Sequence, residues 1–315
     1  MNRKRLRAMA VLIIFFIIVL TALIFDAGLR VLFQSRLTSY NTTYDKQLPA
    51  RTITENGLNA DFFCASSGQR HKTVIILGGS EGGKHWSTNT AYIQQLLDRD
   101  YCVMVLAYFH APGIVEYLRE IPLEYFEKAY QWLSNQAQVI PDEYAVVGHS
   151  RGGELALLLA SRYPQIKSVV AIAPSSVLFP GSPQGFFDVV SGQHAAWSYQ
   201  GTPLPFVPWP VSLRNAPGLV TLRQRSLFEQ ALSNDQAVGS AAIPVENTNG
   251  PILCISAAQD EIWPSTLMCN QIVDRLKQMG FPFRYEHVMH DHTHGWCGFE
   301  ECWGNVIDFL EENFR

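Results

Sequence analysis

The residue of this chain best suited to nucleophilic chemistry is Ser150, at the centre of the segment Gly148–Gly153 (GHSRGG). The apolar, β-branched residues Tyr144–Val147 precede this segment, and the Leu- and Ala-rich residues Glu154–Arg162 follow it. This pattern predicts a strand, a sharp turn and a helix. A G-x-S-x-G sequence in that context is typical of a nucleophile elbow, where glycines relieve crowding around a strained serine. We therefore interpret Ser150 as a nucleophile and not as an incidental serine of a glycine-rich turn.

A serine nucleophile requires a general base, and the base requires an acid that orients it. When the nucleophile lies on such an elbow, the acid and then the base follow later in the chain, in loops after late strands. Asp260 follows the predicted strand Pro251–Ser256, and a group of histidines follows the next predicted strand, Phe283–Met289. We expect Asp260 to be the acid, with the neighbouring Glu261 as the alternative.

Four histidines are candidates for the base: His287, His290, His292 and His294. If the backbone stayed extended, the last three would lie on one face of it, an arrangement that would also suit a metal hydrolase. No other His/Asp motif stands at a plausible ligand spacing, and a metal site would leave the elbow without a purpose. We therefore favour the serine mechanism and expect neither a metal nor another cofactor.

Backbone N–H groups around the elbow could stabilise a developing oxyanion. The helix that begins after the serine offers the N–H group of Arg151 at its N-terminus. A second donor is expected from the glycine-rich loop Gly78–Gly83, which follows the apolar segment Thr73–Leu77. Because glycines let the backbone approach a site closely, the N–H groups of Gly79 and Ser80 are the candidates.

The order of predicted elements indicates a parallel sheet covered by helices on both faces. After a weak strand near Ala60–Phe63, strands are predicted over Thr73–Leu77, Cys102–Tyr108, Tyr144–Val147, Ser168–Ala173, Pro251–Ser256 and Phe283–Met289. Helices are predicted over Ala91–Leu97, Pro122–Ala137, Glu154–Arg162, Leu222–Ser233, Pro264–Met279 and Trp303–Phe314. The alternation stops over residues 175–249, which we expect to form a cap-like excursion above the site, or else a structural decoration.

The N-terminus carries a basic tip followed by an apolar segment. Four cations within residues 1–7 precede Ala8–Phe25, eighteen residues whose only polar member is Thr21. At about 1.5 Å per residue, a helix of this length just spans a hydrocarbon core of about 30 Å. A cleaved signal peptide is the alternative, but Phe25–Ala27 lacks the small-x-small pattern of a cleavage site. We expect an uncleaved anchor.

The anchor divides the chain into three parts. Residues 1–25 would be a cytoplasmic tip and membrane anchor, residues 26–51 a stalk, and residues 52–315 a catalytic domain on the non-cytoplasmic side. The net charge is −4, and the cations cluster only at the N-terminus, so a nucleic-acid partner is not expected. A phosphate-binding loop is disfavoured too, because Lys84 is not followed by Ser or Thr.

The six cysteines fit a non-cytoplasmic location without requiring it. Cys102 and Cys254 fall in predicted core strands and are expected to be small buried apolar residues. Cys297 and Cys302 are the pair expected to form a disulfide if the compartment is oxidising.

Several blocks of the sequence resemble one known family. They are Tyr108, Glu120–Glu127, the elbow running into Gly153–Ser161, Pro174–Val177 and Trp263–Ser265. Over residues 73–314 the chain is similar to the C-terminal catalytic domain of the acyl-CoA thioester hydrolase/bile acid-CoA:amino acid N-acyltransferase family. That resemblance implies an α/β-hydrolase fold. It places Ser150 at the nucleophile position, where the transferase members have cysteine, and so favours hydrolysis.

The resemblance also bears on the other two residues of the mechanism. It places Asp260 at the acid position and His294, just before Gly295, at the base position. The turn that carries the base in the family is altered here and one residue shorter, so His290 and His292 remain alternatives. The family usually carries an N-terminal β-sandwich domain, for which there are too few residues between the predicted anchor and the catalytic domain.

Together these inferences predict a membrane-anchored serine acyl hydrolase that cleaves acyl thioesters or esters. A CoA leaving group follows only from the resemblance. The aromatic and proline-rich residues Phe179–Trp209 suggest a site for a medium or long acyl chain. The alternative from another class is a catalytically silent binding protein on the same fold.

Overall fold

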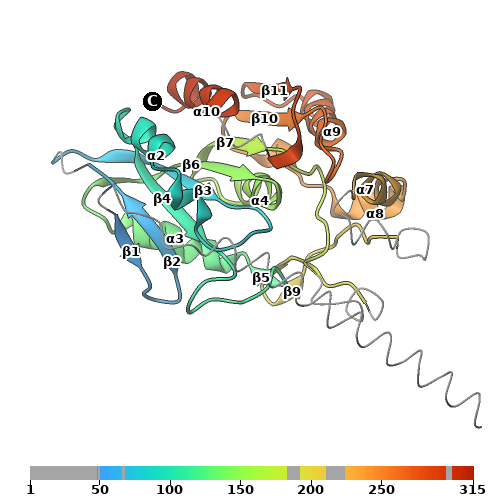
Figure 1. Cartoon of the computed structure of the whole chain (residues 1–315), viewed down its shortest axis with the longest axis horizontal. Coiled ribbons are helices and arrows are strands. Elements are labelled where there is room, and N and C mark those ends of the chain that lie inside the picture. Colours follow the sequence, from blue (N-terminus) through green and yellow to red (C-terminus); the bar gives the residue numbers. More distant parts are fainter. Residues whose placement is uncertain (1–47, 49, 66–67, 183–191, 211–223, 296–299) are drawn as a thin grey trace, which may run out of the picture.

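The computed structural model describes residues 48, 50–65, 68–182, 192–210, 224–295 and 300–315 (Figure 1). The predicted basic tip, the anchor at residues 8–25 and nearly all of the predicted stalk lie outside the described residues. Within the described part of the chain, no helix has both the length and the apolar character needed to cross a membrane.

The described residues form an eight-stranded sheet in the order β1-β2-β4-β3-β6-β7-β10-β11. The strands are β1 (Arg51–Ile53), β2 (Asn59–Phe63), β3 (His71–Leu77), β4 (Cys102–Ala107), β6 (Val139–His149), β7 (Ile166–Ile172), β10 (Ile252–Ala257) and β11 (Tyr285–His290). From β4 to β11 each strand runs parallel to its neighbours, whereas β2 pairs antiparallel with both β1 and β4. The mostly parallel sheet predicted from the sequence is confirmed.

Helices cover both faces of this sheet (Figure 1). One face packs against α2 (Thr90–Leu97) and α10 (Glu300–Asn313), and the other against α3 (Glu124–Ser134), α4 (Arg151–Ala160) and α9 (Ser265–Gln278). Successive side chains of a strand point to opposite faces. In β6, for example, Val146 belongs to one core and Val147 to the other. Apolar strands without alternation therefore mark a sheet buried on both sides, as the sequence indicated.

The excursion at residues 175–249 contains regular structure. It holds β8 (Trp197–Tyr199), β9 (Thr202–Pro203), α7 (Arg225–Leu232), α8 (Asp235–Ala241) and the short 3-10 helix η2 (Val245–Asn247), while a second such helix, η1 (His85–Thr88), follows β3. The described aromatic residues Phe179 and Trp197 are each only 1% exposed and belong to the main core. These two side chains therefore fill the core, while the half-buried Phe206 and Trp209 pack against it. The preference for a medium or long acyl chain stays a prediction.

The start of α3 differs from the prediction. Residues Ile121–Pro122 form the short strand β5, which pairs with β8, and the helix begins only at Glu124. The N–H groups of Ile121 and Leu123 donate to carbonyl groups of Ala196 and Ser198. Because proline has no N–H group to donate, Pro122 can sit between these two hydrogen bonds without loss.

The predicted role of Cys102 was wrong. Cys102 is buried in β4, but it forms a disulfide with Cys64, which follows β2. Strands β2 and β4 are antiparallel neighbours, so two residues 38 positions apart in the chain come together at their ends. Cys254 is buried in β10 as expected. The predicted partner of Cys302, Cys297, lies outside the described residues.

Candidate active site

The serine of the elbow has the strained backbone that the sequence predicts. Ser150 lies between β6 and α4 with φ 57° and ψ −119°, a region that non-glycine residues rarely adopt. A Cβ atom at Gly148 would collide with the Gly152 carbonyl group, and one at Gly152 with the carbonyl oxygens of Leu77 and Gly78. Both glycines of the G-x-S-x-G sequence are therefore required by the close approach of the backbone around Ser150.

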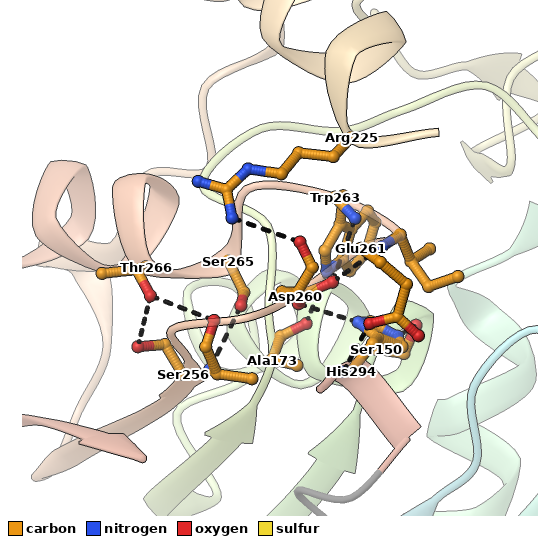
Figure 2. Close-up of polar contacts among 12 residues, drawn as sticks. Ser150, Ala173, Arg225, Ser256, Asp260, Glu261, Trp263, Ser265, Thr266 and His294 are labelled. Carbon is orange, nitrogen blue, oxygen red and sulfur yellow. Dashed lines mark hydrogen bonds and ion pairs between the residues drawn. The ribbon is translucent and has the colours of Figure 1, made fainter. Parts of the chain in front are cut away.

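Three side chains from separate segments meet at this turn (Figure 2). His294 Nε2 lies 2.9 Å from Ser150 Oγ, and His294 Nδ1 lies 2.9 Å from Asp260 Oδ2. With Nδ1–H donating to the carboxylate, the Nε2 lone pair is left to accept the serine proton. Asp260 is 1% exposed, whereas Ser150 and His294 are each 7% exposed, so the hydroxyl and the imidazole keep a small opening to solvent.

The loop after β10 holds Asp260, the predicted acid, in place. The second carboxylate oxygen of Asp260 accepts hydrogen bonds from the backbone N–H groups of Ile262 and Trp263, at 3.0 and 3.1 Å. Glu261, the alternative acid, instead accepts the backbone N–H of His294 at 3.2 Å and so supports the loop that carries the imidazole. Arg225, at the start of α7, donates to the Asp260 carbonyl oxygen at 3.2 Å (Figure 2).

Two aromatic rings flank the imidazole of His294. The Trp263 ring is nearly perpendicular to it, at 5.8 Å between ring centroids, and the tilted His149 ring lies at 5.3 Å. Burial and the neighbouring His294 lower the pKa of His149 to about 4. The neutral His149 ring donates from Nε2 to the His294 carbonyl oxygen at 3.3 Å, so it supports His294 without adding a positive charge beside it.

The structure places the other candidate histidines away from Ser150. His290 Nε2 bonds to Asn305 at 2.8 Å, and both His290 and His292 face the carboxylate of Glu301. His287 bonds to Ser256 on the neighbouring strand at 2.7 Å. Among the described residues, no group of three or more His, Cys, Asp or Glu side chains is arranged to hold a metal ion.

The predicted oxyanion donors lie in two segments. Arg151 is the first residue of α4, where the N–H groups have no acceptor within the helix. In the glycine-rich loop, the N–H of Gly79 donates to the carboxylate of Glu81 at 2.8 Å, and Ser80 is exposed. One of the predicted donors, the Gly79 N–H group, is therefore already hydrogen-bonded to Glu81, a residue to which the sequence analysis gave no role.

Two cations near the site are held by ion pairs. Arg151 Nη1 contacts Glu154 at 2.6 Å, and its Nη2 donates to the Phe179 carbonyl oxygen of the excursion. The same carboxylate accepts Trp197 Nε1–H at 2.7 Å, and burial raises the pKa of Glu154 to about 7 although Arg151 acts to lower it. Lys84 lies 3.0 Å from the fully buried carboxylate of Asp61. Both side chains are committed to internal contacts.

Comparison with known sequences identifies the family. The family described as "BAAT / Acyl-CoA thioester hydrolase C terminal" matches residues 121–295, more than half of the chain. The chain belongs to this family. The family resemblance noted from the sequence is thereby confirmed.

Individual relatives are similar over part of their length. The acyl-coenzyme A amino acid N-acyltransferase 1 of Mus musculus is 28% identical over 59% of this chain and 40% of its own length. The mitochondrial acyl-coenzyme A thioesterase 2 of Mus musculus is also 28% identical, over 59% of this chain and 37% of its own length. The chain thus matches well under half of the length of these relatives.

Solved structures support the fold. The esterase Pf2001 of Pyrococcus furiosus superposes with a TM-score of 0.57 over 87% of this chain and 98% of its own, at 16% sequence identity. The acylaminoacyl peptidase of Pyrococcus horikoshii superposes with a TM-score of 0.53 over 85% of this chain and 43% of its own, at 12% identity. At such identities the likeness concerns the α/β-hydrolase fold.

Several residues at the site went unnoticed in the sequence. Glu154 and Trp263 lay within the blocks that carried the family resemblance, but neither had a chemical role assigned to it. Arg225 lies in a helix that was predicted, yet nothing in its local sequence indicates a contact 35 residues away. Glu81 had a visible signal, because a carboxylate stands alone among the glycines of the predicted oxyanion loop.

The space around two glycines predicts opposite effects on stability when each is replaced by alanine. Gly152→Ala would drive a methyl group into the carbonyl oxygens of Leu77 and Gly78, so the free energy of unfolding should fall by at least about 2 kcal/mol. Gly239→Ala, at a helical position of α8 with open space around it, should raise that free energy by about 0.5–1 kcal/mol. Chemical denaturation of both variants measures the difference, and similar values for the two would contradict the close approach.

Proposed function

We propose that the protein is a membrane-anchored serine acyl hydrolase that cleaves acyl thioesters or esters through Ser150, His294 and Asp260. The observation that carries the proposal is the pair of 2.9 Å hydrogen bonds that joins these side chains in series. Family membership supports the hydrolase class. The strained backbone of Ser150 supports its role as the nucleophile, because such strain is found where a reactive group must be held in place.

In this mechanism His294 accepts the Ser150 proton as the hydroxyl oxygen attacks the acyl carbonyl carbon. Asp260 orients the imidazole and stabilises its protonated form. The N–H groups of Arg151 and of the loop at Gly79 and Ser80 stabilise the oxyanion. His294 then donates its proton to the leaving group, and a water molecule activated by the same imidazole hydrolyses the acyl-enzyme.

The substrate class rests on the relatives. Two of them are named for acyl-coenzyme A chemistry, and we extend an acyl thioester or ester substrate to this chain from that similarity. The carbonyl group is common to both substrates, and the proposed site contacts the carbonyl group. No cofactor takes part in the proposed steps.

We also propose that the apolar segment at residues 8–25 anchors the protein in a membrane, with the catalytic domain on the non-cytoplasmic side. The cations before that segment support this orientation. The disulfide between Cys64 and Cys102 supports it independently, because disulfides persist in oxidising compartments.

The mechanism predicts that a fluorophosphonate labels Ser150 alone. Ser150→Ala and His294→Ala should each lower turnover at least about a thousandfold, since the three residues act as a unit. His290→Ala and His292→Ala are the matched controls and should retain most activity, because these rings bond to Asn305 and Glu301. Peptide mapping of the labelled protein and kcat/KM of the variants measure these effects.

Other outcomes would favour the alternatives. A folded protein that takes no label would favour a binding protein, and activity abolished by EDTA would favour a metal hydrolase.

Because Lys84 and Arg151 are held in internal ion pairs, we expect a CoA leaving group to raise kcat/KM only slightly. Lys84 and Arg151 are paired with Asp61 and Glu154, so neither is available for the phosphates of CoA. We expect kcat/KM for an acyl-CoA to lie within about tenfold of that for the same acyl group on a small uncharged thiol. A hundredfold advantage of the CoA ester would show that residues other than these bind the phosphates.

The proposed location predicts a membrane-bound protein that retains residues 8–25 and whose Cys64 and Cys102 resist alkylation until a reductant is added. Protease applied to spheroplasts should reach the catalytic domain. The Cys64→Ser variant, in which Cys102 becomes available to alkylation after denaturation, is the control. A mature N-terminus near Gly28, or a domain protected from protease, would contradict the anchor or its orientation.

A further inference from the structure

The side chain of Glu81 folds back over the loop that carries it. Its Oε1 accepts the N–H of Gly79 at 2.8 Å, and its Oε2 lies over the same residue. An atom at the Cβ position of Gly79 would be 2.8 Å from Glu81 Oε2 and 3.1 Å from Ser150 Cβ. The Glu81 carboxylate and the Ser150 side chain therefore both border one small space beside Gly79.

The groups that face Glu81 come from four segments. His85 lies in the following 3-10 helix, His294 in the C-terminal loop, Ser150 at the elbow and Tyr108 after β4, with its hydroxyl donating to the Gly78 carbonyl oxygen. In the described part of the chain no lysine or arginine forms an ion pair with Glu81. Burial raises the pKa of Glu81 above its ordinary value, while the Gly79 N–H and the two histidines lower it in part.

We propose that the Glu81 carboxylate occupies the oxyanion position of the substrate-free enzyme and competes with the substrate carbonyl for the Gly79 N–H. The inference rests on the proposed function, because only an acyl-transfer mechanism places an oxyanion at this donor. A carboxylate oxygen has the charge and the acceptor character of the oxyanion that the donor is built to bind. Glu81 is half-buried and has three rotatable bonds, so it can leave the site when a carbonyl oxygen arrives.

The charge of Glu81 determines how strongly it competes. An ionised carboxylate holds the N–H more tightly than a neutral carboxyl does, and it repels a negative oxyanion beside it. Below the pKa of Glu81 the neutral form prevails and the competition weakens. Above that pKa the ionised form prevails, and the stabilisation of a tetrahedral anion at Ser150 should decline.

Two substitutions separate the charge from the contact. In Glu81→Gln the amide oxygen can still accept the Gly79 N–H, but the negative charge is gone. In Glu81→Ala both the charge and the acceptor are removed. Glu312→Gln removes a carboxylate that is 57% exposed on α10 and paired with Arg284, and it serves as the control for a change in net charge.

The test measures binding of an alkyl boronic acid, which forms a tetrahedral anionic adduct when Ser150 Oγ bonds to boron and its proton passes to His294. Kd follows from protection of Ser150 against fluorophosphonate labelling. At pH 8, Glu81→Ala should bind the boronic acid about tenfold or more tighter than wild type, with Glu81→Gln between them and Glu312→Gln unchanged. The ratio of wild-type to variant Kd should fall toward one as the pH is lowered, and titration of the boronic acid cancels in that ratio.

Equal or weaker binding by both Glu81 variants, with unfolding temperatures like that of wild type, would overturn the inference. If Glu81→Ala does not fold, the isosteric Glu81→Gln decides alone, since loss of charge should by itself tighten binding. Failure of the proposed function would look different: wild-type Ser150 would then take neither the fluorophosphonate nor the boronic acid.

Discussion

The close approach of backbone to backbone at the nucleophile turn is the constraint on which the rest of the site depends. Gly152 packs against the carbonyl oxygens of Leu77 and Gly78 with no room for a Cβ atom. This contact fixes the start of α4 against the end of β3. Ser150, which precedes α4, is therefore held close to the glycine-rich loop that follows β3. A looser contact would separate Ser150 from the N–H groups that stabilise the oxyanion in the proposed mechanism.

The excursion is tied to this turn from two directions. Arg151 and Glu154, in the first turn of α4, bond to Phe179 and Trp197 of the excursion. Arg225, at the start of α7, bonds to the backbone of the loop that carries Asp260. Because these contacts involve the nucleophile turn and the acid loop themselves, the excursion contributes to the position of both. Among its described aromatic residues, Phe179 and Trp197 also fill the core beneath it.

Features with a local cause could be predicted from the sequence. The strand–turn–helix around Ser150, the two-sided burial of the strands and the order of Asp260 and His294 all follow from short patterns or chain order. The disulfide between Cys64 and Cys102 could not be predicted, because it depends on the antiparallel pairing of β2 with β4. Likewise the choice of His294 over its neighbours depends on the path of a loop, which period-two spacing describes poorly.

The three carboxylates around His294 show how position decides the effect of one chemical group. Asp260 accepts two backbone N–H groups and the Nδ1–H group of the imidazole, so in the proposed mechanism its charge stabilises the protonated base. Glu261 acts on the backbone N–H of His294 and adds nothing to the ring's hydrogen bonds. Glu81 lies at Gly79, close to Ser150, where a negative charge favours protonated His294 but opposes the oxyanion that the proposed mechanism forms in the same step. Its net effect on the reaction therefore depends on whether the carboxylate remains at Gly79 when the substrate carbonyl arrives.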